Sequence, residues 1–415
     1  MRRYRRGTVL VPTLAILLGL VTLVSTLAIA NRTQMHAEFN RMEADRARLM
    51  AEGAIQRVIA ELQSHNPDLA LQSDTWATLG NSGATQYDVG NDGFRVQVLD
   101  AGAKVNINTA PQAQLTNLPM TSDQVAAVMD WRESQSSPRP TGAKDSYYNS
   151  LTNPYNTKLM PFESPDELLL VKGFTPDNYF QPNPDTADLT TIPPDTLSVP
   201  IRDLVTVDSL SADMDPNGNQ KIDANSALLT QFLSDGITPS VANSIVQARQ
   251  TTPFTKMADI FNNVPGIDTQ SAKLIADFVM IGTTVSHSGL INVNTATAAS
   301  LETIPNISSD LAQAMAQRQS SGYQGLGDLL DVPGMNMNTF AQVIDYLCIG
   351  SAAYNVRAIG MAGNTAYAIE ANLVIQTGGN IQITRERPLS PFDAVNLWQW
   401  NGQPASHEQL GEPLP

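Results

Sequence analysis

The densest group of side chains that could bind a ligand surrounds one glycine near the middle of the 415-residue chain. Carboxylate and amide residues alternate around Gly218, at Asp213, Asp215, Asn217, Asn219 and Asp223. Oxygen ligands in such an order are what a hard cation such as calcium requires. An EF-hand loop, however, would place an apolar residue at Gln220 and a glutamate at Ala224. The same residue types also form metal-free turns, so the sequence allows either a calcium site or a plain turn.

The chain offers no residue pattern typical of a catalytic site. Its four histidines are far apart and mostly flanked by polar residues, so we expect them to be solvated; they are His36, His65, His287 and His407. Gly325 and Gly327 do not follow a strand and therefore do not form a phosphate-binding loop. The single cysteine, Cys348, lies in a mostly apolar run and is expected to be a small buried side chain. We do not expect an enzyme.

A repeated motif supplies the second set of candidate residues. Asn-Ile-Asn-Thr-Ala at 106–110 recurs as Asn-Val-Asn-Thr-Ala at 292–296 and, more weakly, as Asp-Ala-Asn-Ser-Ala at 223–227. The second asparagines are Asn108, Asn225 and Asn294, and an arginine follows each of them after 24 residues, at Arg132, Arg249 and Arg318. Because asparagine accepts hydrogen bonds from the free amides at a helix start, we expect these three asparagines to cap helices.

Each copy predicts short helices joined by tight turns. In the first copy Pro111 suits a first helical turn, Leu115 and Leu118 face inward, and an apolar stripe resumes at Val125 and Val128. A second half follows each copy, with an aromatic residue, an aspartate and a glycine: Phe162, Asp166 and Gly173; Phe254, Asp259 and Gly266; Tyr323, Asp328 and Gly334. This pattern is typical of helix-hairpin-helix units and predicts a compact helical domain over residues 104–350.

Helix-hairpin-helix motifs are best known for gripping the DNA backbone, so a DNA-binding role has to be weighed. Residues 104–350 contain 12 Lys and Arg against 25 Asp and Glu, a local net charge of −13, and the whole chain carries −15. Such a field repels phosphate. The hairpins also lack the Gly-x-Gly that would bring two amides to a phosphate oxygen. We therefore expect a structural use of the motif and no nucleic-acid partner.

The amino-terminal segment places the chain at a membrane. Four arginines in the first seven residues precede residues 8–30, which carry no charge and are long enough as a helix to cross a bilayer. The arginines favour a cytoplasmic amino end, with the rest of the chain across the membrane. Apolar residues then recur at helical spacing to about residue 64, which predicts one long amphipathic helix suited to pack against copies of itself. A plain signal anchor, or a signal peptide cleaved after Ala30, are the alternatives.

Alternating residues predict a small sheet that the helical domain interrupts. The alternation appears at residues 94–98 and returns only at 354–359, 366–375 and 380–385. Segments this far apart pair if residues 104–350 are inserted between them. Residues 66–93 are predicted to be mostly loop, and residues 388–415 a loose tail. The fold class expected is α+β, with a long amino-terminal helix, a small antiparallel sheet and a large all-helical insert.

The amino terminus resembles that of type IV pilins and type II secretion pseudopilins, in which a short basic leader ending in glycine is removed before a methylated first residue. The resemblance implies a leader at 1–7, cleavage by a prepilin peptidase after Gly7, and a methylated Thr8. It divides the helix into a transmembrane part at 8–30 and an amphipathic part at 31–65. Most members carry glutamate at the fifth mature residue, where it neutralises a neighbour's buried amino terminus, whereas this chain has Pro12. An unpaired buried charge is costly, so such a subunit packs poorly beneath another one.

The order of the leader, helix, repeats and closing strands, with the segment 131–180 between repeats, is similar to the general secretion pathway protein K family. This resemblance implies a pilin-like domain at 66–103 and 351–387, interrupted by the helical domain and seated at the tip of a periplasmic pseudopilus. It implies other minor pseudopilins and the major pseudopilin as partners, and a single-pass protein in a bacterial inner membrane. Family members bind calcium in the helical domain, but Arg132, Gln135 and Lys144 stand here where acidic residues are commoner. The alternative is a membrane-anchored DNA receptor of the competence type.

Overall fold

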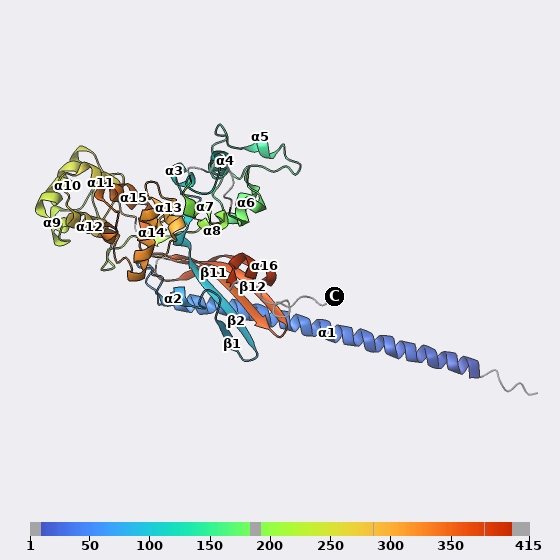
Figure 1. Ribbon diagram of the computed structural model, residues 1–415. Coiled ribbons are helices and arrows are strands. Elements are labelled where there is room, and N and C mark those ends of the chain that lie inside the picture. The colour runs from blue at the N-terminus through green and yellow to red at the C-terminus, as the bar shows by residue number, and fades with distance from the viewer. Residues whose placement is uncertain (1–9, 183–191, 285, 377, 401–415) are drawn as a thin grey trace, which may run out of the picture.

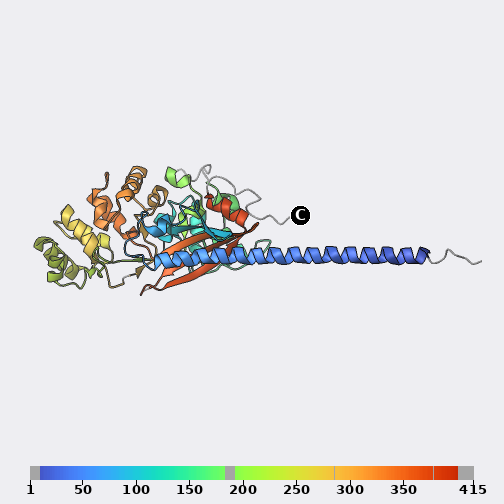
Figure 2. The ribbon, with the colours of Figure 1, turned by 90° about the horizontal axis from the view of Figure 1, so that it is seen from below.

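A single long helix organises the molecule. The computed structural model describes residues 10–182, 192–284, 286–376 and 378–400. Helix α1, Leu10–Leu62, is 53 residues long and projects far from the globular part, whose domains gather around its carboxyl-terminal end (Figures 1 and 2). The expected continuous helix is confirmed and ends two residues before the expected end. Helix α2, Thr75–Thr78, follows after a loop.

One five-stranded antiparallel sheet crosses the carboxyl-terminal part of α1 (Figure 1). Its order is β1-β2-β11-β12-β13, with bounds Gln86–Val89, Asp92–Asp100, Ala353–Ala362, Thr365–Ile375 and Ile381–Leu389. β2 and β11 are neighbours although more than 250 residues separate them, and their register runs from Asp100↔Tyr354 to Asp92↔Ala362. The chain therefore leaves the sheet after Asp100 and returns at Ala353, as the insertion prediction requires.

Helix α1 lies against one face of this sheet through small side chains. Ala47, Ala51 and Ala54 are completely buried, and Val58 continues the same stripe. They meet β11, where Gly360 allows close approach because a Cβ there would lie 2.0 Å from the carbonyl oxygen of Ala47. Tyr354, Val356 and Ala358 of β11, Val96 and Val98 of β2 and residues of β12 complete this core.

The insert consists of three units built to one plan. Each unit begins with a two-residue strand, continues through a series of short helical segments and closes when a second two-residue strand pairs in parallel with the first. The strand pairs are β3, Val105–Asn106, with β4, Val205–Thr206; β6, Ile222–Asp223, with β7, Val279–Met280; and β9, Ile291–Asn292, with β10, Leu347–Cys348. A small antiparallel pair, β5 (Ser211–Ala212) and β8 (Ser286–His287), joins the linkers that flank the second unit.

The helices of the units follow in order. The first unit holds η1 (Ala101–Ala103) at its entrance and then α3 (Gln112–Leu115), α4 (Ser122–Arg132), α5 (Asp145–Tyr148), η2 (Pro165–Leu170), α6 (Pro176–Phe180), α7 (Pro194–Leu197) and α8 (Ile201–Leu204). The second holds α9 (Leu229–Ser234), α10 (Pro239–Thr251), α11 (Met257–Asn263) and α12 (Thr269–Phe278). The third holds α13 (Ala298–Glu302), α14 (Ser309–Arg318), η4 (Gln319–Ser321), η5 (Leu326–Asp331), α15 (Met337–Val343) and η6 (Ile344–Tyr346).

The three units divide into two cores. Apolar side chains of the first and third units interlock in one cluster that includes Leu115, Trp131, Leu301 and Phe340. The second unit has its own cluster around Phe232, Ile245 and Ile275, and its helices α9 and α10 lie at the far end of the molecule (Figure 1). Proline-glycine hairpins join the paired helices where expected, and Gly266 and Gly334 adopt φ of +81° and +89°, which favours glycine.

The carboxyl-terminal prediction is wrong in part. Residues 388–400 do not form a loose tail: β13 continues to Leu389, and α16, Pro391–Trp398, packs on the sheet face opposite α1 (Figure 1). Trp398 and Trp400 are almost fully buried against Ile359 and Ala368. Three apolar side chains in α16 and a tryptophan just beyond it provide the burial that makes this segment fold. Residues 401–415 lie outside the described part of the chain.

Candidate functional site

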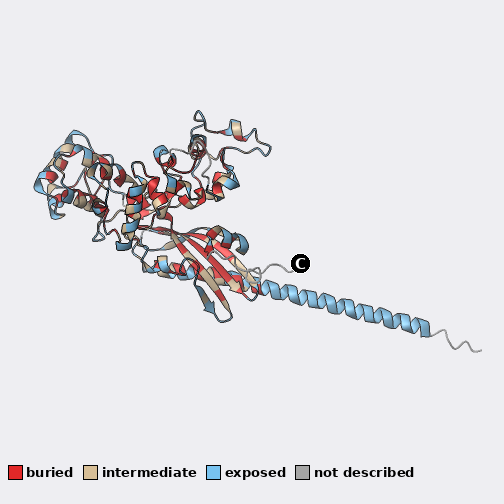
Figure 3. Ribbon diagram, in the orientation of Figure 1, coloured by how far each residue is buried: buried red, intermediate tan, exposed pale blue. Residues whose placement is uncertain are grey.

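The largest unpartnered feature of the described chain is the projecting part of α1. Fifteen large apolar side chains between Leu10 and Met42 are 48–76% exposed, and Figure 3 shows the projecting shaft exposed along its length. The most apolar 18-residue window of the helix has a mean hydropathy of 2.3 and none of it is buried. Among the described residues this is the one helix long and apolar enough to cross a membrane. Exposed apolar surface of this extent marks a site that lipid or protein covers.

The shaft is also free of charge over six turns. From Leu10 to the residue before Arg32 the helix contains no titratable side chain. Its threonine hydroxyls are hidden by donation to carbonyl oxygens of the preceding turn, as in Thr22 to Gly19 and Thr26 to Leu23, both at 2.9 Å. The shaft therefore suits hydrocarbon as well as the interior of a helical bundle.

Pro12 lies in the first turn of α1, where its missing N–H costs little because the first amides of a helix have no intrahelical partner. No carboxylate takes the place of the glutamate that the resemblance would lead one to expect at this position. Gly7 and Thr8, the residues predicted for cleavage and methylation, lie outside the described residues.

One ion pair joins the carboxyl-terminal half of α1 to the sheet. Arg46 donates to Asp92 at the start of β2, with Nε to Oδ2 at 2.9 Å, and this bidentate contact crosses between the two elements. The pairs Arg48–Glu52 and Arg57–Glu61 stay within the helix. The helix is therefore fixed to the sheet by a buried stripe and one cross-pair, while its apolar side chains between Leu10 and Met42 are exposed.

The three repeat asparagines are not helix caps. In each unit the asparagine amide clamps the backbone of the aromatic residue that opens the second half: Asn225 accepts from the Phe254 amide at 2.9 Å and donates to its carbonyl at 2.9 Å. Asn294 makes the same pair with Tyr323, at 2.7 and 3.0 Å. Asn108 makes it with Phe162, at 2.7 and 2.9 Å.

The helices that follow these asparagines begin elsewhere. The residue before α3 is Pro111, whose side chain cannot cap, and Thr297 caps α13 by accepting from Ser300 N. The capping prediction is wrong because an asparagine amide offers both a donor and an acceptor, and one backbone residue of the second half satisfies both. These residues staple the two halves of each unit.

In two of the three units, the arginine at constant spacing donates to backbone carbonyls of the repeated motif. Arg132 donates to the carbonyls of Ile107 and Ala110, and Arg249 donates to that of Ala224 at 2.8 Å. In the third unit Gln319 takes this role with the carbonyls of Val293 and Ala296. Arg318 points instead toward Asp328 and Asp331, 3.7 Å from each.

The proposed calcium ligands do not converge. Asp215 accepts from the amides of Asn217 and Asn219, both at 2.8 Å, and so builds a turn from its own neighbours. Asp213 pairs with Lys221 at 2.7 Å, and Asp223 accepts from Asn225, Ser226 and Gly282. Among the described residues no group of three or more His, Cys, Asp or Glu is placed to hold a metal. In this arrangement the cluster forms a hydrogen-bonded turn from its own neighbours, and calcium binding there stays a prediction.

The loop after Trp131 is organised by protein cations. Arg139 pairs with Asp130 at 2.8 Å and Glu133 at 2.7 Å, and the Asp130 side chain is completely buried. The Lys144 ammonium donates to the carbonyls of Asp130 and Glu133. Burial lowers the pKa of Lys144, and the neighbouring Asp130 and Glu133 oppose this shift. Arg139 therefore neutralises both carboxylates of this loop, and Lys144 binds the backbone carbonyls beside them.

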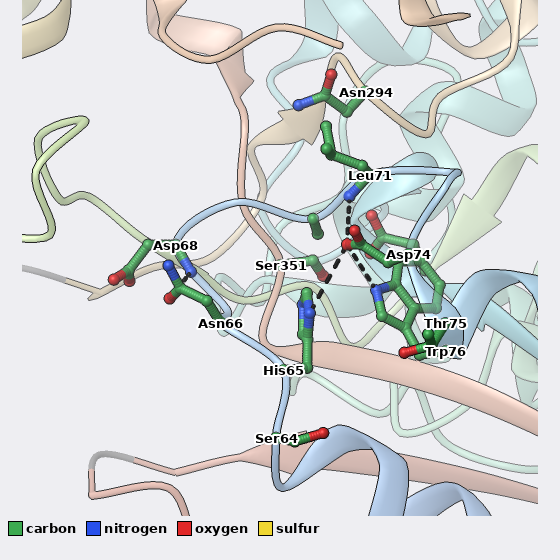
Figure 4. A network of polar contacts seen from close by, with 12 residues as sticks. Ser64, His65, Asn66, Asp68, Leu71, Asp74, Thr75, Trp76, Asn294 and Ser351 are labelled. Carbon is green, nitrogen blue, oxygen red and sulfur yellow. Dashed lines mark hydrogen bonds and ion pairs between the residues drawn. The ribbon is translucent and has the colours of Figure 1, made fainter.

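One histidine is not solvated as expected. The His65 side chain is 7% exposed at the turn after α1 and lies 3.7 Å from Asp74, beside Trp76 (Figure 4). Its ring packs edge-on against Trp76 and against Tyr354 of β11. Asp74 also accepts from Leu71 N at 2.8 Å and Trp76 Nε1 at 3.1 Å. Burial lowers the pKa of His65, although Asp74 acts in the opposite direction. Sequence neighbours gave no sign of this burial because the covering residues come from α2 and β11.

The joint between the sheet and the insert is a buried polar contact. Asp100, the last residue of β2, accepts from Gly102 N at 2.7 Å, Asn292 Nδ2 at 2.8 Å and Thr295 Oγ1 at 2.5 Å. The first of the two repeat asparagines in the third unit therefore binds the sheet, while the second staples the unit. Cys348, buried as expected, lies in the same unit and burial raises its thiol pKa.

Comparisons with known proteins agree with this arrangement. Residues 102–184 match the family model for the type II secretion system (T2SS), protein K, and residues 286–348 match the helix-hairpin-helix motif. No curated protein sequence matches the chain. The fold is similar to that of a chain in the crystal structure of the GspK-GspI-GspJ complex from the enterotoxigenic Escherichia coli type 2 secretion system. The similarity has a TM-score of 0.50 at 14% identity and covers 86% of this chain and 99% of the other. The expected α+β fold is confirmed.

Proposed function

We infer that this chain is a minor pseudopilin of the type II secretion system, of the protein K family, and we propose that it occupies the tip of the pseudopilus. Its exposed apolar shaft would anchor the subunit in the bacterial inner membrane and later pack among the helices of other pseudopilins. The globular part would lie in the periplasm. The observation that carries the tip position is the placement of a bulky insert at the end of α1 far from the membrane part (Figure 2).

Charge accounts for the direction of assembly. A pseudopilin packed beneath another one uses glutamate at the fifth mature position to neutralise the amino terminus above it, and Pro12 cannot do this. A buried uncompensated amino group costs several kcal/mol, so a subunit carrying Pro12 is excluded from places that have a neighbour above. The tip is the one place in a filament without that requirement.

The insert would act as a cap and a starting point. Its second and third units lie beyond the sheet, where a further subunit would have to stack, and the acidic charge of the insert repels a second copy of the same domain. GspK is found with GspI and GspJ in the similar crystal structure, which supports other minor pseudopilins as the partners. The competence-type DNA receptor is not favoured, because the family match points to secretion and the insert is strongly acidic.

The tip position is tested by changing residue 12. Pro12→Glu should let the chain enter the body of the filament, so that immunogold label appears along assembled pseudopili instead of at one end. Pro12→Gln is the matched control, because glutamine has nearly the shape of glutamate without its charge. This variant should stay at the end of the filament. The tip position is contradicted if the unchanged protein is labelled along the filament, or if no label appears at an end.

Processing is tested on the same protein. We propose that a prepilin peptidase cleaves after Gly7 and that Thr8 is methylated, which mass spectrometry of the mature amino terminus would register as methyl-Thr8. An amino terminus at Asn31 would indicate a signal peptidase and would remove the shaft on which assembly depends.

A further inference from the structure

A small cavity lies at the joint between the sheet and the first helix-hairpin-helix unit. It has a volume of about 60 Å³ and is bounded by β2, β11, β12 and β13 on one side and by η2, α6 and α8 on the other. Five cationic residues line it: Lys104, Arg202, Arg357, Arg385 and Arg387. The carboxylates at its wall are Asp100, Asp166 and Glu370. In a chain with a net charge of −15 this concentration of cations is unusual.

Three of the cations have protein partners. Arg387 pairs with Asp166 and, at 2.8 Å, with Glu370, and so ties β13 to η2 and to β12. Arg385 donates to the Glu163 carbonyl at 2.7 Å, and Arg202 to the Leu397 carbonyl at 3.2 Å. These contacts fasten the first unit to the sheet and to α16.

The other two cations are incompletely satisfied. The Arg357 side chain is only 9% exposed, yet its Nε makes no hydrogen bond and lies 3.8 Å from the nearest Glu370 oxygen. Its Nη1 has only a long contact of 3.4 Å with Gln97. The Lys104 ammonium has no hydrogen bond or ion pair with any described residue. Burial lowers the pKa of Lys104 to about 8 and that of Arg357 to about 10.

The nearby carboxylates do not supply the missing partner. Asp100 is fully used by the third unit and its own loop, while Asp166 and Glu370 are held by Arg387. Asp203 acts on Lys104 and Arg357 only at a distance beyond an ion pair. The buried Arg357 Nε therefore has no hydrogen-bond acceptor beyond its loose ion pair with Glu370, and Lys104 lines the same cavity without a hydrogen bond or ion pair to a described residue. Buried donors in folded proteins are nearly always paired.

We propose that this cavity binds a small oxyanion, phosphate or a carboxylate, between Lys104 and Arg357. A cavity of this volume holds about four water molecules, which is the space that one such ion requires. Charge-assisted hydrogen bonds from guanidinium and ammonium groups are the strong contacts that recognise these ions. Because the walls come from both the sheet and the first unit, the ion would strengthen the joint between them.

The test uses the full-length chain in non-ionic detergent with inorganic phosphate as the probe. The ³¹P resonance of phosphate should broaden when protein is added. The protein should also unfold at a higher temperature in phosphate than in chloride of equal ionic strength. Lys104→Gln should weaken binding about tenfold or more, the loss of roughly one charge-assisted contact. Lys172→Gln is the matched control, because Lys172 is a lysine away from this cavity that donates to the Thr141 carbonyl.

Acetate in parallel distinguishes the two sources of the oxyanion. A response to phosphate indicates a free ion, and a response to acetate alone indicates a site for a protein carboxylate; either, if lost in Lys104→Gln, supports the proposal. Equal responses of the unchanged protein and Lys104→Gln, or no response to either anion, overturn it. Normal circular dichroism of Lys104→Gln shows that lost binding is not lost folding. These readouts are independent of filament assembly, so the tip proposal does not stand or fall with them.

Discussion

Replacing Gly360 by alanine should loosen the contact between α1 and the sheet. A Cβ at this position would lie 2.0 Å from Ala47 O, 2.4 Å from Ala51 N and 2.9 Å from the Met50 side chain. The first two are backbone atoms of a helix, which cannot rotate away. To restore an ordinary separation the helix must move outward by more than about 1 Å along this contact.

The displacement would fall on the best-packed part of the pilin-like core. Ala47, Ala51 and Ala54 have no exposed surface and would lose contact with β11 together. Over-packing by one methyl group costs about 1–3 kcal/mol, and we expect the upper half of that range because the obstruction is backbone. The measurement is urea unfolding of the full-length chain in detergent, followed by tryptophan fluorescence.

Gly53→Ala in the same helix is the matched control. Nothing lies within 4 Å of a Cβ at Gly53, so alanine there should raise stability by about 0.5–1 kcal/mol through helix propensity alone. Opposite shifts for the two alanines would support the close-approach argument. If Gly360→Ala proved as stable as the unchanged protein, the separation of helix and sheet described above would have to be wrong.

Three further outcomes follow. Asn294→Ala should lower the free energy of unfolding in urea by about 3 kcal/mol because it leaves the buried Tyr323 backbone unpaired. Asn225→Ala, at a half-buried asparagine, should cost about half as much. Equal or negligible losses would show that these asparagines do not hold the two halves of a unit together. Because burial lowers the pKa of His65, the folded state resists its protonation, so stability should hold above about pH 6.5 and fall as the pH drops below it. His65→Gln should flatten that fall and the exposed His36→Gln should not; identical profiles would exclude His65 as the cause. Finally, EDTA should leave the unfolding temperature unchanged, since Arg139 and Lys144 already neutralise the loop after Trp131, and a clear decrease would reveal a metal site.

The sequence was sufficient for the architecture because long-range pattern and local pattern agree. Strand alternation stopped at one point and resumed some 250 residues later, and β2 and β11 pair at that break. The repeated Asn-x-Asn-Thr-Ala predicted three units, and the structure contains three. The segment from Pro391 to Trp400 was missed because proline and glutamine suggested a loop, while burial of two tryptophans outweighs those local preferences.

The role of the repeat asparagines was missed for a different reason. Asparagine is suited both to capping a helix and to binding the backbone of a distant residue, so the residue type alone does not distinguish the two. What separates them is the partner, and the partner is distant: Phe254 and Tyr323 each follow their asparagine by 29 residues, and Phe162 follows by 54. The equal spacing in two units is a signal that the sequence contains, but the first unit hides it by the longer connection that carries α5. The assignment of aspartates failed in the same unit. Glu167, not Asp166, accepts from the residue after the aromatic, as Asp259 and Asp328 do elsewhere.

This one-residue difference explains how the first unit came to hold the sheet. With Glu167 serving the unit's own turn, Asp166 is free to accept from Tyr179 and to pair with Arg387 of β13. The third unit divides two roles between neighbouring residues in the same way. Asn294 holds the unit's two halves together, and Asn292 binds Asp100 of β2. The second unit makes no such contact with the five-stranded sheet among the described residues and has a separate core. It is docked on the third unit instead: Asp345 accepts from the amides of Met257 and Ala258, and Gly327 donates to Asp277. The second unit should therefore move with α1 through the third unit.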